Sequence, residues 1–150
     1  MPVLWTVSHS TRLVVISVKS VVLLEDMEEC VEGIMTPATL SYRKLMDLSE
    51  GHLALSREDM VALAEYVREH SGTSPMGALA IMVASDEGEQ QARLFESLSV
   101  VNRPLKIFRE LQAARAWLDA QPSPALPLWL EEVSPAVQPG GPTSGMSVHC

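Results

Sequence analysis

Short apolar runs alternate with helical stretches along most of this chain. Residues 78–84 (ALAIMVA) are apolar throughout, which is typical of a strand covered on both faces of a sheet. Helical patterns precede and follow this run, and further strand-like runs lie at residues 43–48 and 105–108. Because strands joined in turn by helices need right-handed crossovers, this order predicts a largely parallel sheet.

The beginning of the chain departs from this alternation. Residues 4–8 and 12–18 are both strand-like, and the polar sequence SHST separates them. This spacing predicts a hairpin, so the sheet begins antiparallel. Helices are predicted over 24–35, from a cap at Ser56 to Gly72, after Ser85, and over 110–120. The predicted fold class is therefore α/β, with a mixed, mostly parallel sheet flanked by helices.

The chain divides into a domain over residues 1–120 and a tail over residues 121–150. Pro, Gly and Ser dominate the tail, and each proline removes a backbone donor, so we expect a disordered segment. Residues 125–133 (ALPLWLEEV) are more apolar than a linker requires. We expect Met82 and Trp117 to be buried in the core of the domain. The last helix is expected to pack through Leu111, Ala114, Trp117 and Leu118.

Charge and cysteine content exclude several classes of partner. The formal net charge is -8 and the basic residues are scattered, which argues against a nucleic acid and against an anionic membrane surface. The apolar stretch over residues 13–24 is interrupted by Lys19 and is too short for stable membrane insertion. Cys30 and Cys150 have neither a near partner nor a metal-ligand spacing. We therefore predict a reduced, cytoplasmic protein without a metal or a cofactor.

Polar side chains follow several of the predicted strands. In open α/β sheets, ligands bind at the carboxyl ends of the strands. The residues that we place at this candidate interaction edge are Asp47, Ser49, Ser56, Ser85 and Asp86. Arg109 follows the fifth strand and is expected at the same edge.

Each of these residues also has a structural interpretation. Asp47 and Asp86 are either a carboxylate pair for acid–base or metal chemistry, or residues of turns and helix caps, and we favour the second. Ser56 is either a modified or nucleophilic serine, or a helix cap, and again we favour the cap. No serine lies in a G-x-S-x-G elbow, and the glycines form no phosphate-binding loop. We therefore predict no catalytic residue and no enzymatic activity.

Five segments carry a family pattern through their order and spacing. They are RLVVISVKSVVLLEDM (12–27), YRKLMDLSEG (42–51), GALAIMVASD (77–86), ARLFESL (92–98) and RPLKIFRELQAARAWL (103–118). Together they resemble the SpoIIAA-like (STAS-like) family of small bacterial proteins, which is related in fold to anti-sigma-factor antagonists. The resemblance covers residues 4–120 and implies a binding or regulatory module without catalysis.

The resemblance also points to one regulatory position. In STAS antagonists a partner kinase phosphorylates a serine at the start of the helix after the central strand, which ends partner binding. The resemblance places that serine at Ser56, where the family's Asp-Ser-Ser-Gly pattern is replaced by LSRE. Because Glu58 and Asp59 already make this helix start acidic, we expect Ser56 to remain unphosphorylated.

Two functions from different classes remain open. The first is a non-catalytic regulatory or protein-interaction module of STAS type, which binds a protein that the sequence does not name through the edge around residues 49–60. The second is a carrier of a small apolar or lipid-like ligand held between helices. A homodimer is compatible with both.

Overall fold

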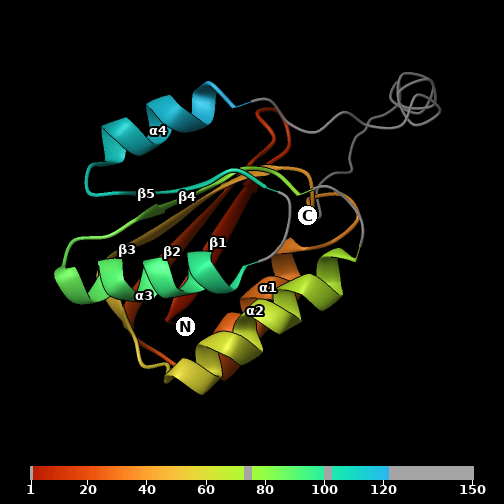
Figure 1. Ribbon diagram of the computed structural model, residues 1–150. Helices are drawn as coiled ribbons and strands as arrows, with labels where there is room; N and C mark the ends of the chain where they lie inside the picture. The colour runs from red at the N-terminus through yellow and green to blue at the C-terminus, as the bar shows by residue number, and fades with distance from the viewer. Residues whose placement is uncertain (1, 73–75, 100–102, 122–150) are drawn as a thin grey trace.

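Five strands form one sheet with helices on both of its faces (Figure 1). The computed structural model describes residues 2–72, 76–99 and 103–121. In chain order the elements are β1 (Val3–Ser8), β2 (Leu13–Val22), α1 (Leu24–Ile34), β3 (Arg43–Leu53), α2 (Arg57–Ser71), β4 (Leu79–Met82), α3 (Asp86–Leu98), β5 (Leu105–Phe108) and α4 (Leu111–Asp119). This order confirms the predicted hairpin followed by alternating helices and strands.

The topology explains how the helices divide between the two faces. The strands lie in the order β1-β2-β3-β4-β5, and only the β1–β2 pair is antiparallel. Each helical crossover therefore connects a strand to its next neighbour, always toward the same edge of the sheet. Right-handed crossovers in one direction place their helices on the same face of the sheet. That face carries α1, α2 and α3, whereas α4 follows the last strand and lies on the other (Figure 1). The predicted fold class is confirmed.

Apolar side chains fill both sides of the sheet. In β2, Val14, Ile16 and Val18 are buried with the period of two that a strand imposes. They face the larger core beneath α1, α2 and α3. A smaller core, built on Leu45 and Ala80, lies under α4, which contacts β3, β4 and β5.

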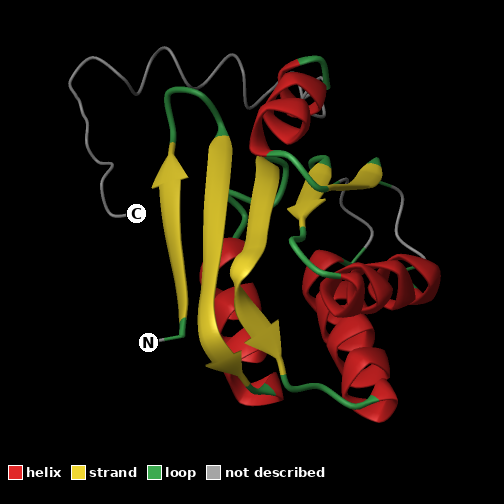
Figure 2. Cartoon of the chain, turned by 90° about the vertical axis from the view of Figure 1, so that its left-hand side faces the viewer, coloured by secondary structure: helices red, strands yellow, loops and turns green. Residues whose placement is uncertain are grey.

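The predicted ends of two strands are wrong. The sequence placed the end of the second strand at Val18 and that of the third at Leu48, whereas β2 runs to Val22 and β3 runs to Leu53. The extension of β3 (SEGHL) is mostly polar and that of β2 (KSVV) begins with Lys19 and Ser20, so neither continues the preceding apolar run without a break. The register shifts at this point, because Ser17 pairs with Asp47 but Lys19 pairs with Glu50, which leaves one extra residue in β3. Figure 2 shows β2 and β3 extending beyond the short strands β4 and β5.

The extension of β3 depends on a glycine. A Cβ atom added at Gly51 would lie 2.4 Å from Cγ1 of Val18 and 2.6 Å from the backbone oxygen of the same residue. Only glycine therefore allows the two strands to approach this closely after the bulge.

The packing of α4 differs in part from the prediction. Met82 is buried as expected, and so are Ala114 and Leu118. Trp117 is only half-buried, although its ring packs against Phe108 with centroids 5.7 Å apart, and Leu111 is 47% exposed. The helix is short and covers only part of its face of the sheet, so its two largest apolar side chains stay at the margin. The predicted tail lies outside the described residues from 122 onward.

Candidate functional site

Asp47 and Ser49 form a local unit in the middle of β3. Oδ1 of Asp47 accepts the backbone N–H of Ser49 at 2.9 Å and its hydroxyl at 2.6 Å. Ser49 has no Cα partner in β2 at the bulge, and the carboxylate of Asp47 accepts its backbone N–H. Asp47 thus supports a bulge within the strand, whereas the structural interpretation placed it in a turn or at a helix cap.

Ser85 and Asp86 lie at the start of α3. The Ser85 hydroxyl accepts the backbone N–H of Gly88 at 3.0 Å, which makes it the helix cap. Asp86 is exposed and accepts Nη2 of Arg109 at 2.9 Å. Asp86 and Arg109, which we expected at the same edge, therefore contact each other.

Arg109 holds a second carboxylate of the same helix. Its Nη2 lies 2.7 Å from Oε1 of Glu89, whose other oxygen binds Arg93 at 2.8 Å. The Arg109 hydrogen bond, assisted by Arg93, holds the pKa of Glu89 below its usual value. Each acid here already has a basic partner, which is typical of a surface ion-pair network.

Ser56 caps α2. Its hydroxyl accepts the backbone N–H of Asp59 at 3.1 Å, and Oδ2 of Asp59 accepts the backbone N–H of Ser56 at the same distance. This reciprocal capping box confirms the predicted helix start.

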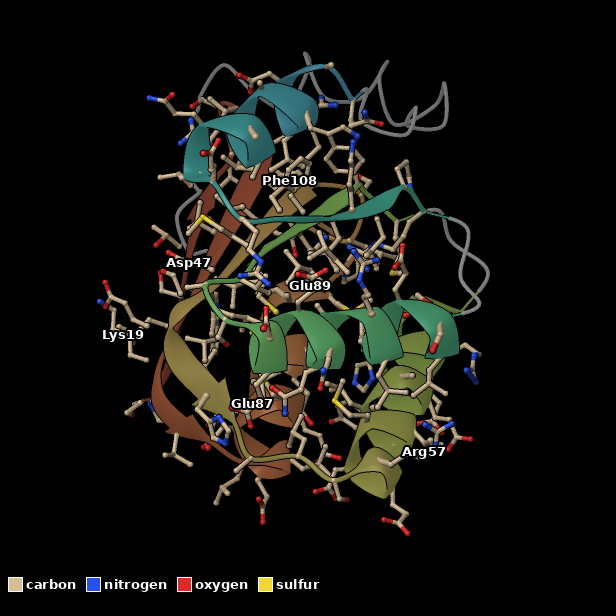
Figure 3. All side chains as sticks on the ribbon, turned by 60° about the vertical axis from the view of Figure 1, so that its left-hand side comes forward. Lys19, Asp47, Arg57, Glu87, Glu89 and Phe108 are labelled. Atoms are coloured by element: carbon tan, nitrogen blue, oxygen red, sulfur yellow. The ribbon has the colours of Figure 1, made fainter. Side chains whose placement is uncertain are left out.

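The five candidate residues occupy three separate places. Within the described ranges no hydrogen bond or ion pair joins the Asp47–Ser49 unit to Ser85 or Asp86, or either of them to Ser56. Figure 3 shows the separation directly, because Arg57, the neighbour of Ser56, lies far from Asp47. As an interaction edge the set stays a prediction.

A cavity that the sequence analysis missed lies between the sheet and its three-helix face. It has a volume of about 60 Å³. Ile16, Met27 and Leu63 are among the apolar side chains around it, which come from the sheet and from α1, α2 and α3. Lys44 and Arg103 are its charged lining residues, and no described lining residue is acidic.

Lys44 is a buried cation on β3, with only 2% of its surface exposed. Its Nζ donates to the backbone oxygens of Thr39 and Leu40 at 3.0 Å and of Tyr42 at 2.9 Å. Burial, reinforced by the positive charge of Arg103, lowers the pKa of Lys44 to about 7. The ammonium thus holds the loop before β3 against the sheet through these three hydrogen bonds. Among the described residues, no acid forms an ion pair with it.

Arg103, just before β5, is the second cation. Its Nε donates to the backbone oxygen of Gly77 at 3.0 Å, and its Nη1 lies 3.7 Å from the sulfur of Met76. Its Nη2 is buried and has no hydrogen-bond partner in the part of the chain that the structure describes. Burial lowers the pKa of Arg103 to about 10.

One sequence signal could have revealed part of this cavity. Lys44, Met46 and Leu48 share one face of β3 by the period of two, and all three line the cavity. A lysine in phase with apolar residues of a covered strand predicts a buried charge. No local pattern connects Lys44 to Arg103, which the fold brings together from a distant segment.

Comparisons with known proteins give a similar structure but no family. No family model and no curated protein matches the chain. Among solved structures, the chain is similar to an uncharacterized protein of the DUF3478 family from Shewanella loihica, described as having a SpoIIAA-like fold. The two are 19% identical with a TM-score of 0.49, over 77% of this chain and 91% of the other.

The described residues contain neither a candidate membrane-spanning helix nor a candidate metal site. No helix there combines the length and the apolar character needed to cross a bilayer. No group of three or more His, Cys, Asp or Glu side chains in the same ranges is arranged to hold a metal ion.

Proposed function

We propose that this chain is a non-catalytic binding module that recognises a partner protein through the end of the sheet where β2 and β3 finish. The observation that carries the proposal is the exposure of two large apolar side chains there. Val21 is 57% exposed and Leu23 is 50% exposed, and they are two residues apart in the chain. Large apolar side chains exposed together cost free energy in water unless a partner covers them.

The surroundings of this pair support an interface. Val21 pairs with His52 of β3, and Ser56 begins α2 shortly after that strand. Polar contacts lie on the same two strands: Lys19 binds Glu50 at 3.0 Å, and His52 lies 3.4 Å from Glu87 of α3. An apolar centre with a polar rim is the usual composition of a protein–protein interface.

The same end of the sheet is held firmly. Nε2 of Gln91, on α3, donates to the backbone oxygen of Leu53 at the last residue of β3, at 2.6 Å. A surface held in one conformation loses less entropy when it binds a partner. The extension of β3 therefore presents the apolar pair on a fixed support.

A non-catalytic role agrees with how the candidate hydroxyls are used. Ser56 and Ser85 accept backbone N–H groups as helix caps, and the Ser49 hydroxyl donates to Asp47. None of these serines has a histidine as a hydrogen-bond partner among the described residues, so no activated nucleophile is formed. We place this module in the reducing cytoplasm, a proposal supported by the free, buried thiol of Cys30.

Affinity capture with matched variants tests the proposal. Val21→Thr with Leu23→Ser removes the apolar surface, yet threonine suits a strand and serine suits the helix start. The control is Leu4→Thr with Leu111→Ser, which removes similarly exposed side chains from β1 and α4. We expect the wild type and the control to capture the same protein from cells that express the chain, and the Val21/Leu23 variant to lose it. Equal capture by all three chains contradicts this surface.

The cavity favours a second candidate function, the binding of a small apolar ligand. Nearly all of its described lining is apolar, and it is enclosed between the sheet and α1, α2 and α3. Apolar cavities in proteins bind small apolar molecules when their shape allows it. Native mass spectrometry of the protein purified from its own cells tests this candidate, with a bound small molecule as the expected result.

A further inference from the structure

Two cations line an apolar cavity whose described lining residues include no acid to neutralise them. Lys44 is buried and donates to three backbone oxygens, while Arg103 donates to one backbone oxygen and lies against a methionine sulfur. A buried positive charge is unfavourable unless an anion or another compensating group lies beside it. Here the compensation from protein atoms is incomplete.

One atom of Arg103 lacks a hydrogen-bond acceptor. Nη2 of Arg103 is buried, carries two N–H donors, and has no hydrogen-bond partner among the described residues. Buried guanidinium groups usually satisfy such donors, most strongly with a carboxylate. The unmatched donor therefore marks a place for an anionic acceptor.

The rest of the cavity fits the apolar part of the same molecule. Its volume of about 60 Å³ is less than half of the roughly 150 Å³ of a cavity that holds benzene, so it has room for an alkyl chain of about two carbon atoms. Met27, Met35, Met46 and Met60 all line it, and flexible thioether side chains adapt to the shape of an alkyl chain.

We propose that this cavity binds a short-chain carboxylate, with its acidic group on Arg103 beside Lys44 and its alkyl chain among the methionines. This inference rests on the second candidate function and adds the charge of the ligand to it. It needs no covalent step, and it makes the cavity a site distinct from the surface at Val21 and Leu23.

The matched probes for the test are propionate and propanamide, which have the same chain length but differ in charge. The signals are the ¹³C methyl groups of the four cavity methionines, with Met82, which is outside the cavity lining, as the internal reference. We expect propionate to shift the cavity methyls and to bind about tenfold or more tightly than propanamide, because a hydrogen bond to a charged group is the stronger one.

Substitutions at two arginines locate the charge effect. Arg103→Met removes the cation but keeps an apolar side chain of similar reach, so propionate should lose its advantage over propanamide. Arg109→Met removes an arginine that binds Asp86 and Glu89 outside the cavity, so the advantage should persist. If Arg103→Met fails to fold, Arg103→Lys keeps the charge without the Nη2 donor, and it should weaken propionate binding selectively.

Proton uptake gives an independent readout. The titratable groups that line the cavity are Cys30 of α1, Lys44 of β3 and Arg103, while the lining residues of α2 and α3 do not titrate. An anion beside Lys44 raises the pKa of its ammonium, so binding at pH 8 should take up protons from the buffer. Calorimetry in buffers of different ionisation enthalpy measures that uptake.

The outcomes separate the two claims. Equal binding of propionate and propanamide overturns the carboxylate inference but leaves the apolar-ligand candidate intact. No shift of the cavity methyls with either compound overturns both. Neither result bears on the protein-binding surface at Val21 and Leu23, which is tested by capture.

Discussion

Replacing Lys44 by methionine should change how the stability of this protein depends on pH. In the folded protein the Lys44 ammonium is buried, and its pKa is lowered from 10.5 to about 7 by burial and by Arg103. The unfolded chain therefore holds this proton between pH 7 and pH 10.5, while the folded protein has mostly lost it. Because the unfolded state binds more protons in this range, stability rises as the pH rises.

The size of the effect follows from the two pKa values. One proton of difference between the two states changes the free energy of unfolding by about 1.4 kcal/mol per pH unit. At pH 7 the folded group is half protonated, so the gain from pH 7 to pH 9 is about 2 kcal/mol. Above pH 9 the buried Cys30 opposes this trend, because burial raises the pKa of its thiol from 9.0 to about 12. The range from pH 7 to pH 9 therefore isolates Lys44.

Urea unfolding at pH 7, 8 and 9 measures this slope. We expect the wild type to gain stability across the series and Lys44→Met to show a flatter profile. The variant also leaves the backbone oxygens of Thr39, Leu40 and Tyr42 without their donor, so it should be less stable at pH 9. The slope, rather than the absolute stability, is the decisive quantity. Parallel profiles for the two proteins would show that Lys44 keeps an ordinary pKa and would refute the reasoning.

Three further predictions concern the helices and the tail. Ser56→Ala should lower the free energy of unfolding by about 0.5–2 kcal/mol in urea titrations, whereas Ser56→Asp should be nearly neutral because aspartate also caps a helix; phosphopeptide mass spectrometry of cell-derived protein should find Ser56 unmodified. Trp117→Ala should cost less than the roughly 3–5 kcal/mol typical of a fully buried aromatic side chain, because Trp117 is only half-buried, and a larger loss in thermal unfolding would contradict this packing. A chain that ends at Gln121 should keep its melting temperature within a few degrees, and a larger fall would mean that the removed residues support the domain.

The architecture could be predicted because its determinants are local. The switch from strand period to helix period around residue 24, and the capping box at Ser56, both depend on residues close in sequence. The lengths of β2 and β3 could not be predicted in the same way. Polar residues interrupt the apolar runs at Lys19 in β2 and after Leu48 in β3, and the two strands continue beyond these points by pairing with each other.

The functional features depend more on tertiary contacts than the architecture does. The sequence identified Ser56, Ser85 and Asp47 as polar residues at turns or caps, and the structure shows what each one binds. It did not identify the cavity, because Lys44 and Arg103 come from separate segments and meet only after the sheet forms. The exposure of Val21 was equally hidden, since it depends on the twist and register of β2 beyond the bulge.

Site-specific photocrosslinking in living cells tests the proposed binding surface most directly. A photoreactive phenylalanine analogue is placed at position 21 in one protein and at position 111 in a second, because Val21 and Leu111 are similarly exposed but lie on different elements. We predict that the analogue at position 21 crosslinks to one discrete protein and that the analogue at position 111 does not. Adding Leu23→Ser should abolish the crosslink at position 21. A crosslink at position 111 alone, or the same product from both positions, would contradict a partner bound at the end of β2 and β3.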